Sequence, residues 1–200
     1  MSQFLFDMTS QELTQTSYSK EQYFALLADS EHKYEYLGGP VRMMAGGKAA
    51  HNRIIRNCNR ALDGKSDECE VFLSDTAISI YPLDKIYFPD LSAVCGEPAN
   101  DEEGGTERIK NPTLIIEVLS KKTATIDRGE KFQAYRQLPS VKEYIMIDSL
   151  SYLIETHYQE TQDLWRIGNY YQLGQRVPFV TIGVTVPLSV IYENVLLTAD

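Results

Sequence analysis

The 200-residue sequence has little cysteine and no long apolar run. Its uninterrupted apolar stretches, such as 114–116 and 195–197, are far shorter than the roughly 20 residues that a membrane helix requires, so no membrane span is expected. The three cysteines, at positions 58, 69 and 95, are odd in number and widely spaced, which fits neither a disulfide framework nor a CxxC metal pattern. We interpret them as reduced thiols of a cytoplasmic protein.

Basic residues are also scarce, since 19 Lys and Arg stand against 28 Asp and Glu and give a net charge of -9. This balance excludes general coating of nucleic acid or anionic membrane by the whole surface, although a local basic stripe can still bind phosphate. The 43% of hydrophobic residues is typical of a folded globular protein. Without repeats or breaks in composition, residues 1–200 are expected to form one domain, with 1–18 a flexible or peripheral segment.

Periodicity and turn residues predict a mixture of helices and strands. Helices are expected over 20–29, 48–63 and 124–138, because apolar residues recur there at helical spacing. A hairpin is expected within 33–47, and a hydrophilic loop over 96–111. Strands are expected at 70–74, 77–82, 86–94, 113–120, 141–148, 151–159 and in the segment from 165 to 187. One mixed sheet flanked by helices is the simplest architecture for this order.

Glu117 is the first candidate for chemistry, because it interrupts the apolar run 114–119. An ionised carboxylate in a strand covered on both faces is costly unless a cation or several donors compensate it. The alternative is a glutamate at a strand end that pairs with Lys121 or Lys122 in solvent.

Three further residues each have an ordinary structural explanation when taken alone. Asp90 follows Pro89 and can be a turn former or a metal ligand, and Glu35 can be a solvent-facing strand residue. Lys131 lies four residues after Asp127, which is the spacing of a helix surface pair. As a set, however, three carboxylates and a lysine can bind a hard divalent cation, activate water and neutralise charge on a phosphate.

Four segments resemble, in order and spacing, the successive motifs of the Uma family of restriction-endonuclease-like domains, a branch of the PD-(D/E)xK nuclease superfamily. They are KYEYLGGPVRMMAGGKAAH, FPDLSAV, LIIEVLSKKTATIDRGEKFQAY and VKEYIMID. The resemblance covers about residues 20 to 158 and implies an α+β fold with a restriction-endonuclease-like mixed β-sheet flanked by α-helices. It also implies a site at Glu35, Asp90 and Glu117. The lysine position of the superfamily is Leu119 here, and the resemblance implies that Lys131 supplies the charge from the following helix.

His51 falls on the histidine position of the same family. It can transfer a proton or hold a phosphate, or it can serve only the start of its helix. On that helix Arg53, Arg56 and Arg60 share one side, which makes a basic stripe that either contacts DNA or is a solvated face. Lys121 and Lys122 are the other candidates for phosphate contacts.

These observations favour a Mg²⁺-dependent (or Mn²⁺-dependent) DNA endonuclease that hydrolyses phosphodiester bonds. Asp90, Glu117 and Glu35 would hold the metal, and Lys131 would stabilise charge on the attacked phosphate. DNA is the expected partner, and a homodimer would be the simplest way to cut both strands. The alternative is a noncatalytic protein-interaction domain that retains the nuclease fold.

Overall fold

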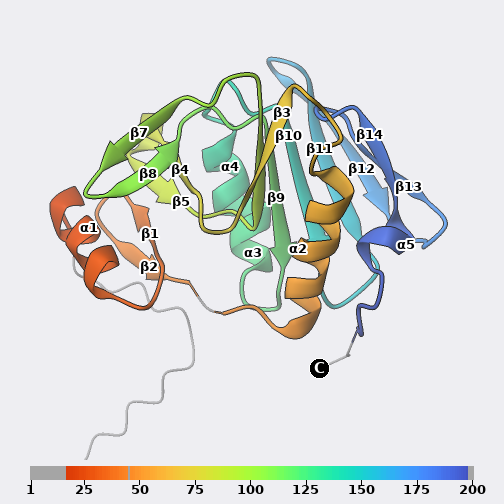
Figure 1. Ribbon diagram of the computed structural model, residues 1–200, viewed down its shortest axis with the longest axis horizontal. Helices are drawn as coiled ribbons and strands as arrows, with labels where there is room; N and C mark the ends of the chain where they lie inside the picture. The colour runs from red at the N-terminus through yellow and green to blue at the C-terminus, as the bar shows by residue number, and fades with distance from the viewer. Residues whose placement is uncertain (1–16, 45, 198–200) are drawn as a thin grey trace, which may run out of the picture.

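In the described part of the chain, the strands form two six-stranded β-sheets and one two-stranded sheet, with helices packed against them (Figure 1). This is the arrangement in a computed structural model, which describes residues 17–44 and 46–197. Most of the segment 1–18, expected to be peripheral, therefore lies outside the described residues. The expected α+β class is confirmed, but the strands are divided between two large sheets instead of being gathered in one.

The first large sheet contains the N-terminal hairpin. Its strand order is β2 (Val41–Met43), β1 (Tyr34–Leu37), β5 (Lys85–Tyr87), β4 (Ala77–Ile80), β8 (Thr106–Ile109) and β7 (Asn100–Glu103), with the 3₁₀ turn η1 (Tyr81–Leu83) between β4 and β5. Helix α1 (Lys20–Asp29) begins with a capping box between Ser19 and Gln22 and packs Tyr23 and Phe24 in the same apolar cluster as strands of this sheet. The predicted first helix and hairpin are thereby confirmed.

The second large sheet forms the centre of the molecule. Its strand order is β12 (Leu164–Tyr170), β11 (Ile154–Thr161), β10 (Glu143–Asp148), β9 (Leu114–Leu119), β6 (Leu91–Cys95) and β3 (Cys69–Leu73). Strands β9 and β10 run parallel, and all six residues of β9 are buried. This burial explains why β9 has apolar residues at consecutive positions, as expected for a strand covered on both faces.

Helices cover the two faces of this sheet (Figure 1). Helix α2 (Ala49–Leu62), which confirms the helix predicted over 48–63, packs with Leu114, Ile116 and Val118 on one face. The opposite face, with Ile115 and Leu119, packs against the segment 124–138 and against β4 and β5 of the first sheet. Because side chains alternate along a strand, Glu117 belongs to this second face, where the two sheets meet.

The helix predicted over 124–138 is present but irregular. It consists of α3 (Ala124–Ile126), a five-residue π-helical segment η2 (Asp127–Lys131) and α4 (Phe132–Tyr135). Short π-helical segments within helices are frequent at functional sites. Here the segment carries Lys131 as its last residue.

Three predictions about strands are corrected. The single strand predicted over 86–94 is interrupted at Pro89 and Asp90, and its halves become β5 and β6 in different sheets. The predicted loop 96–111 contains the β7–β8 hairpin, which turns at Gly104 and Gly105 with positive φ. The strand expected in the segment from 165 to 187 is divided among β12 and a hairpin of β13 (Arg176–Phe179) and β14 (Val184–Pro187), which is followed by α5 (Leu188–Ile191).

The expectation of three reduced thiols is wrong for two of them. Cys69 and Cys95 form a disulfide, because the register of the antiparallel strands β3 and β6 places these residues opposite each other. Cys58 is a free thiol buried in the core. Within the part of the chain that the structure describes, no helix is long and apolar enough to cross a membrane.

Asn57 fastens the C-terminal segment to α2. Its amide Nδ2 donates hydrogen bonds of 2.9 Å to the backbone oxygens of both Ile191 and Glu193. We expect Asn57→Ala to lower the free energy of unfolding by about 1–3 kcal/mol, because it leaves these carbonyl oxygens without their donor. Urea denaturation measures this loss. Asn59→Ala, a half-buried position on the same helix, is the control and should change stability by less than about 0.5 kcal/mol; equal losses in the two variants would contradict the role of Asn57.

Candidate active site

A cavity of about 360 Å³ lies where the two large sheets meet. Glu35 reaches it from β1 of the first sheet, and Glu117 reaches it from β9 of the second. The π-helical segment η2 contributes Asp127 and Lys131, and the N-terminal end of α2 contributes His51. Segments far apart in the sequence therefore supply one site.

Lys131 is the centre of this site. Its Nζ lies 2.9 Å from Glu35 Oε1 and 2.9 Å from Glu117 Oε1, and 3.7 Å from Asp127 Oδ1. All four side chains are almost completely buried, with exposed fractions of 4 to 7%. One ammonium group thus joins carboxylates from both sheets in a region that is largely shielded from solvent.

Burial and charge shift the protonation of this cluster. Burial raises the pKa of Glu117 well above its ordinary range, although the ammonium group of Lys131 opposes the shift. Burial acts to lower the pKa of Lys131, but Glu117, Glu35 and Asp127 outweigh it and raise that pKa well above its ordinary range. Lys131 is therefore held as a cation.

Arg42 binds Oε2 of Glu35, the carboxylate oxygen other than the one that contacts Lys131. Its Nη2 and Nε donate to Glu35 Oε2 at 2.8 and 3.0 Å, and its Nη1 donates to Glu130 Oε2 at 3.1 Å. The hydroxyl of Tyr87 donates to the other oxygen of Glu130 at 2.7 Å. Since Glu130 directly precedes Lys131, these contacts of Arg42 connect the β1–β2 hairpin to the segment η2, which carries Lys131.

Asp90 lies next to Glu117 across neighbouring strands, because Leu91 pairs with Ile116. Its Oδ2 accepts a hydrogen bond of 2.7 Å from the backbone N–H of Val118, and His51 Nε2 lies 3.3 Å from the same oxygen. Burial acts to lower the pKa of His51, but the contact with Asp90 outweighs it and raises that pKa.

The structure brings most of the predicted site residues together. The cavity is lined by Glu35, His51, Asp90, Glu117, Lys121, Lys122 and Lys131. Two of the structural alternatives are wrong: Glu117 is buried against Lys131 and not paired with Lys121 or Lys122 in solvent, and Glu35 does not face solvent. The catalytic roles of these residues stay a prediction.

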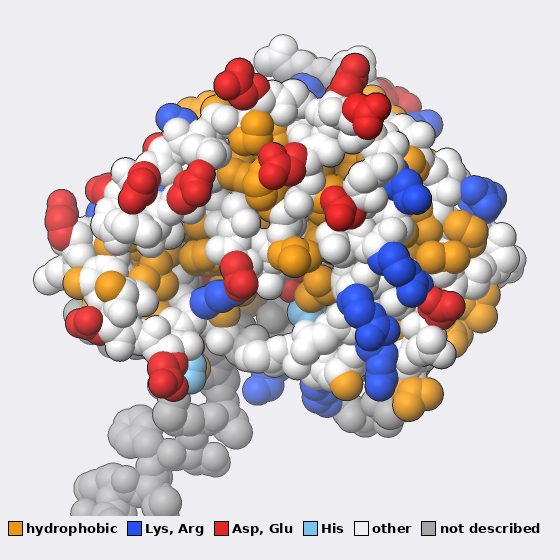
Figure 2. Space-filling view, viewed as in Figure 1, with side chains coloured by type: hydrophobic (Ala, Val, Ile, Leu, Met, Phe, Trp, Pro, Cys, Tyr) orange, Lys and Arg blue, Asp and Glu red, His pale blue; other side chains and the backbone are white. Residues whose placement is uncertain are grey.

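The basic stripe lies outside the cavity. Figure 2 shows Lys and Arg side chains gathered in a band over α2, the helix that carries Arg53, Arg56 and Arg60. Arg56 and Arg60 are exposed, and Arg60 forms an ion pair with Glu193. None of these three arginines lines the cavity.

Three residues around the cluster, Arg42, Glu130 and Tyr87, are not among those predicted from the sequence, and Asp127 is predicted only as a surface partner of Lys131. A signal for Arg42 was present, because a tight hairpin at Gly38 and Gly39 places Glu35 opposite Arg42. The other residues gave no local signal, since their positions depend on how the two sheets pack.

The donor set suits a divalent cation. Glu35, Asp90, Glu117 and Asp127 are hard oxygen ligands. Among the buried side chains of the cavity, the three carboxylates Glu35, Glu117 and Asp127 outnumber the two cations Arg42 and Lys131. Among the described residues, no group of three His, Cys, Asp or Glu side chains is already arranged to hold a metal ion. Lys131 Nζ lies close to oxygens of both Glu35 and Glu117, and Asp90 is the carboxylate on the strand that neighbours Glu117.

Replacement of Lys131 by methionine should destabilise the fold. Removing one partner from a buried ionic cluster costs about 3–5 kcal/mol, because the remaining charges are uncompensated. Burial already raises the pKa of Glu117, so the native state binds more protons than the unfolded state as the pH approaches ~4.3, the ordinary value for Glu. The loss of stability caused by Lys131→Met should therefore be smaller at acidic pH and larger as the pH rises.

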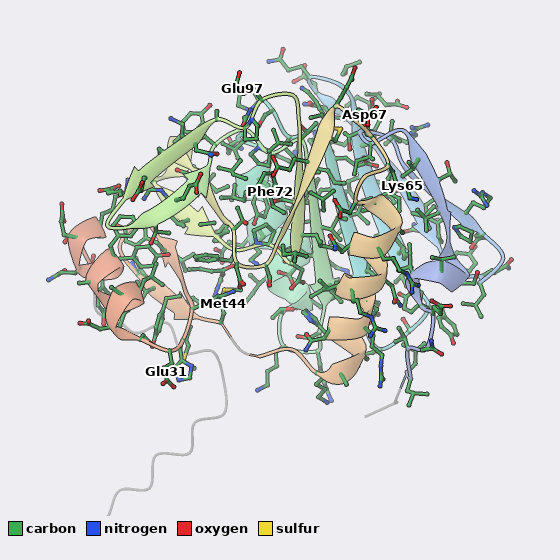
Figure 3. The ribbon with its side chains drawn as sticks, in the orientation of Figure 1. Glu31, Met44, Lys65, Asp67, Phe72 and Glu97 are labelled. Atoms are coloured by element: carbon green, nitrogen blue, oxygen red, sulfur yellow. A yellow bond between two sulfur atoms is a disulfide. The ribbon has the colours of Figure 1, made fainter. Side chains whose placement is uncertain are left out.

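Urea denaturation of Lys131→Met at pH 5 and pH 8 measures this effect. Lys65→Met is the control, because Lys65 lies beyond the C-terminal end of α2, away from the cavity (Figure 3). A Lys131→Met protein as stable as the Lys65→Met protein at both pH values would contradict the buried cluster.

Comparisons with known proteins place the chain in a family. A family model described as "Uma2: Putative restriction endonuclease" matches residues 20–189. Two uncharacterised proteins of Synechocystis sp. are similar: slr1290 is 33% identical over 181 residues, 88% of this chain and 92% of its own length, and sll1609 is 35% identical over 133 residues, 66% of this chain and 74% of its own length.

A solved structure has the same fold. The crystal structure of a "putative nuclease belonging to DUF820" from Anabaena variabilis superposes with a TM-score of 0.66 at 17% identity, over 86% of this chain and 97% of that chain. This structural match and the family match over most of the chain confirm the expected resemblance to the Uma family. The chain belongs to the Uma2 family, whose members are described as putative restriction endonucleases.

Proposed function

We propose that the protein is a metal-dependent endonuclease that hydrolyses phosphodiester bonds in DNA. The observation that carries the proposal is the position of Lys131, 2.9 Å from carboxylates of both sheets at the floor of an open cavity. A buried cation among surplus carboxylates is expensive to build for stability alone. It is suited to a reaction in which a phosphate gains negative charge.

Asp90 and Glu117 would hold Mg²⁺ or Mn²⁺, with Glu35 as a further ligand or as the group that orients water. When bound, the cation would supply charge neutralisation at the phosphate and a water of lowered pKa. A homodimer belongs to the same proposal, because two identical sites would act on the two strands of DNA.

The protein's own residues have separable tasks. Lys131 stays protonated, so it would stabilise negative charge on the attacked phosphate and would not act as a base. Arg42 would keep Glu35 in position through its two hydrogen bonds to Glu35 Oε2. His51, at the edge of the cavity beside Asp90, would exchange protons with water or with the leaving group.

Replacement of Glu117 by glutamine tests the reaction. We expect the protein to cut DNA with Mg²⁺ or Mn²⁺ and to lose cleavage when EDTA is added. Glu117→Gln should reduce the rate by about 100-fold or more, because it removes a charged ligand next to Lys131. Gel assays on supercoiled, linear and single-stranded DNA measure these rates.

Glu97→Gln is the matched control, since Glu97 is exposed on a loop at the opposite edge of the molecule (Figure 3). This variant should cut at the wild-type rate. If wild-type protein cuts no DNA with either cation, or if Glu117→Gln cuts as fast as wild type, the nuclease proposal fails. The first result would favour the noncatalytic interaction domain.

Two groups of basic residues compete as the path of the DNA. Lys121 and Lys122 are exposed at the cavity, whereas Arg53 and Arg56 lie on α2 outside it. If Lys121 and Lys122 each contact a phosphate, Lys121→Gln with Lys122→Gln should flatten the slope of log affinity against log salt by about 1.4 on single strands or ~1.8 on duplex DNA. Arg53→Gln with Arg56→Gln should change the slope less.

Fluorescence anisotropy with labelled DNA at several salt concentrations gives these slopes. A larger change of slope in the Arg53 and Arg56 variant than in the Lys121 and Lys122 variant would assign the DNA path to the basic stripe on α2. Equal and negligible effects would leave neither group with a role in binding.

A further inference from the structure

The walls of the cavity are more apolar than its floor. Met43 and Met44 at the end of β2, Ile126 in α3 and Leu150 after β10 all line it, and each is only half-buried. Figure 3 shows Met44 between the β1–β2 hairpin and the helical segment of α3. Four apolar side chains from three segments thus stand around a charged site.

Hydrolysis of a phosphate does not require these apolar walls. Charged and polar groups are sufficient to bind and polarise a phosphate, and partly solvated apolar side chains gain nothing from it. Nucleobases, by contrast, have flat faces that pack well against apolar and aromatic side chains whatever their sequence. The walls therefore match a part of the substrate other than its phosphate.

The cavity has the size of a site for one small molecule. Its volume of about 360 Å³ lies at the low end of the ~300–1,000 Å³ that is usual for small-molecule pockets. The side chains of Glu35, Glu117 and Lys131 are only 4 to 7% exposed, so a phosphate must enter the cavity to reach them. A site of this size suits one nucleotide better than a base pair.

Positive charge lies at the cavity as well. Lys121 and Lys122 are exposed where β9 leads into α3. A strand that inserts one nucleotide keeps its flanking phosphates outside, where these ammonium groups can bind them.

From these observations we infer that the cavity receives one unpaired nucleotide, with its base against Met44, Ile126 and Leu150 and its phosphate toward Lys131. This inference rests on the proposed nuclease function and names its substrate class: single-stranded or locally opened DNA in preference to intact duplex. Removing a base from a duplex costs free energy that an unpaired strand does not require.

Binding of labelled 20-nucleotide DNA to the full chain carrying Glu117→Gln tests the inference without cleavage. We expect a single strand, or a duplex with a three-nucleotide bubble, to bind at least about tenfold more tightly than the fully paired duplex. Charge alone predicts the opposite order, because the duplex has the higher charge density. Equal or tighter binding of the intact duplex, or no binding of any DNA, overturns the inference.

The apolar walls are tested with two strands of equal charge, oligo(dT) and an abasic strand of the same length. The protein should bind oligo(dT) about tenfold more tightly, and Ile126→Ser with Leu150→Ser should remove that difference while leaving abasic binding unchanged. The control pair Leu164→Ser with Ile167→Ser alters exposed apolar residues of β12, away from the cavity, and should keep the difference. If Ile126→Ser with Leu150→Ser also keeps the difference in affinity between oligo(dT) and the abasic strand, the base does not occupy the cavity.

The outcomes separate this inference from the proposed function. Cleavage of duplex and single strands at equal rates, with loss of cleavage in Glu117→Gln, would support the nuclease function and contradict the binding of an unpaired nucleotide. Preferential binding of single strands by a protein that cleaves no DNA would support the nucleotide site and contradict the nuclease function.

Discussion

The ammonium group of Lys131 is buried between two sheets, and the surrounding structure has to compensate its charge. Taking a cation out of water is costly unless opposite charges lie at contact distance in good geometry. Glu35 from the first sheet and Glu117 from the second provide these contacts, both at 2.9 Å from Nζ. The two sheets must therefore dock in one register, because a shift of either sheet would leave a buried charge without its partner. Arg42 extends the constraint, since it binds Glu35 and Glu130 together.

Much of the candidate site could be predicted from local sequence. Glu117 interrupts an apolar strand, and the cost of that position indicates a compensating cation nearby. The identity of that cation came only from family resemblance, because Lys131 follows in a separate helix and reaches Glu117 through a π-helical turn that no periodicity reveals. Glu130 and Tyr87 could not be found, since their hydrogen bond joins elements of different layers. Local patterns thus indicated the carboxylates, whereas the geometry of the cluster depends on tertiary packing.

The fold shows the same division between local and long-range information. Helices α1 and α2 and the buried strand β9 have strong patterns and lie where the sequence predicts them. The β7–β8 hairpin was missed because β7 is acidic and largely exposed and β8 buries only its last two residues, so neither has the apolar alternation of a half-buried strand. The break at Pro89 was missed because an apolar run does not show which sheet each half will join. The Cys69–Cys95 pair was missed because it depends on the register of β3 with β6.

The burial of Lys131 also determines its reactivity toward reagents that modify amines. Such reagents need an accessible, neutral amine, and the Lys131 side chain is 7% exposed and is kept protonated by its carboxylate neighbours. Lys121 and Lys122, which are exposed, have no such protection. Acetylation of Lys131 therefore requires its ion pairs with Glu35 and Glu117 to open, and the rate at which this amine is labelled reports how often these contacts between the two sheets break. The same side chain that would stabilise a phosphate is thus a built-in indicator of local unfolding.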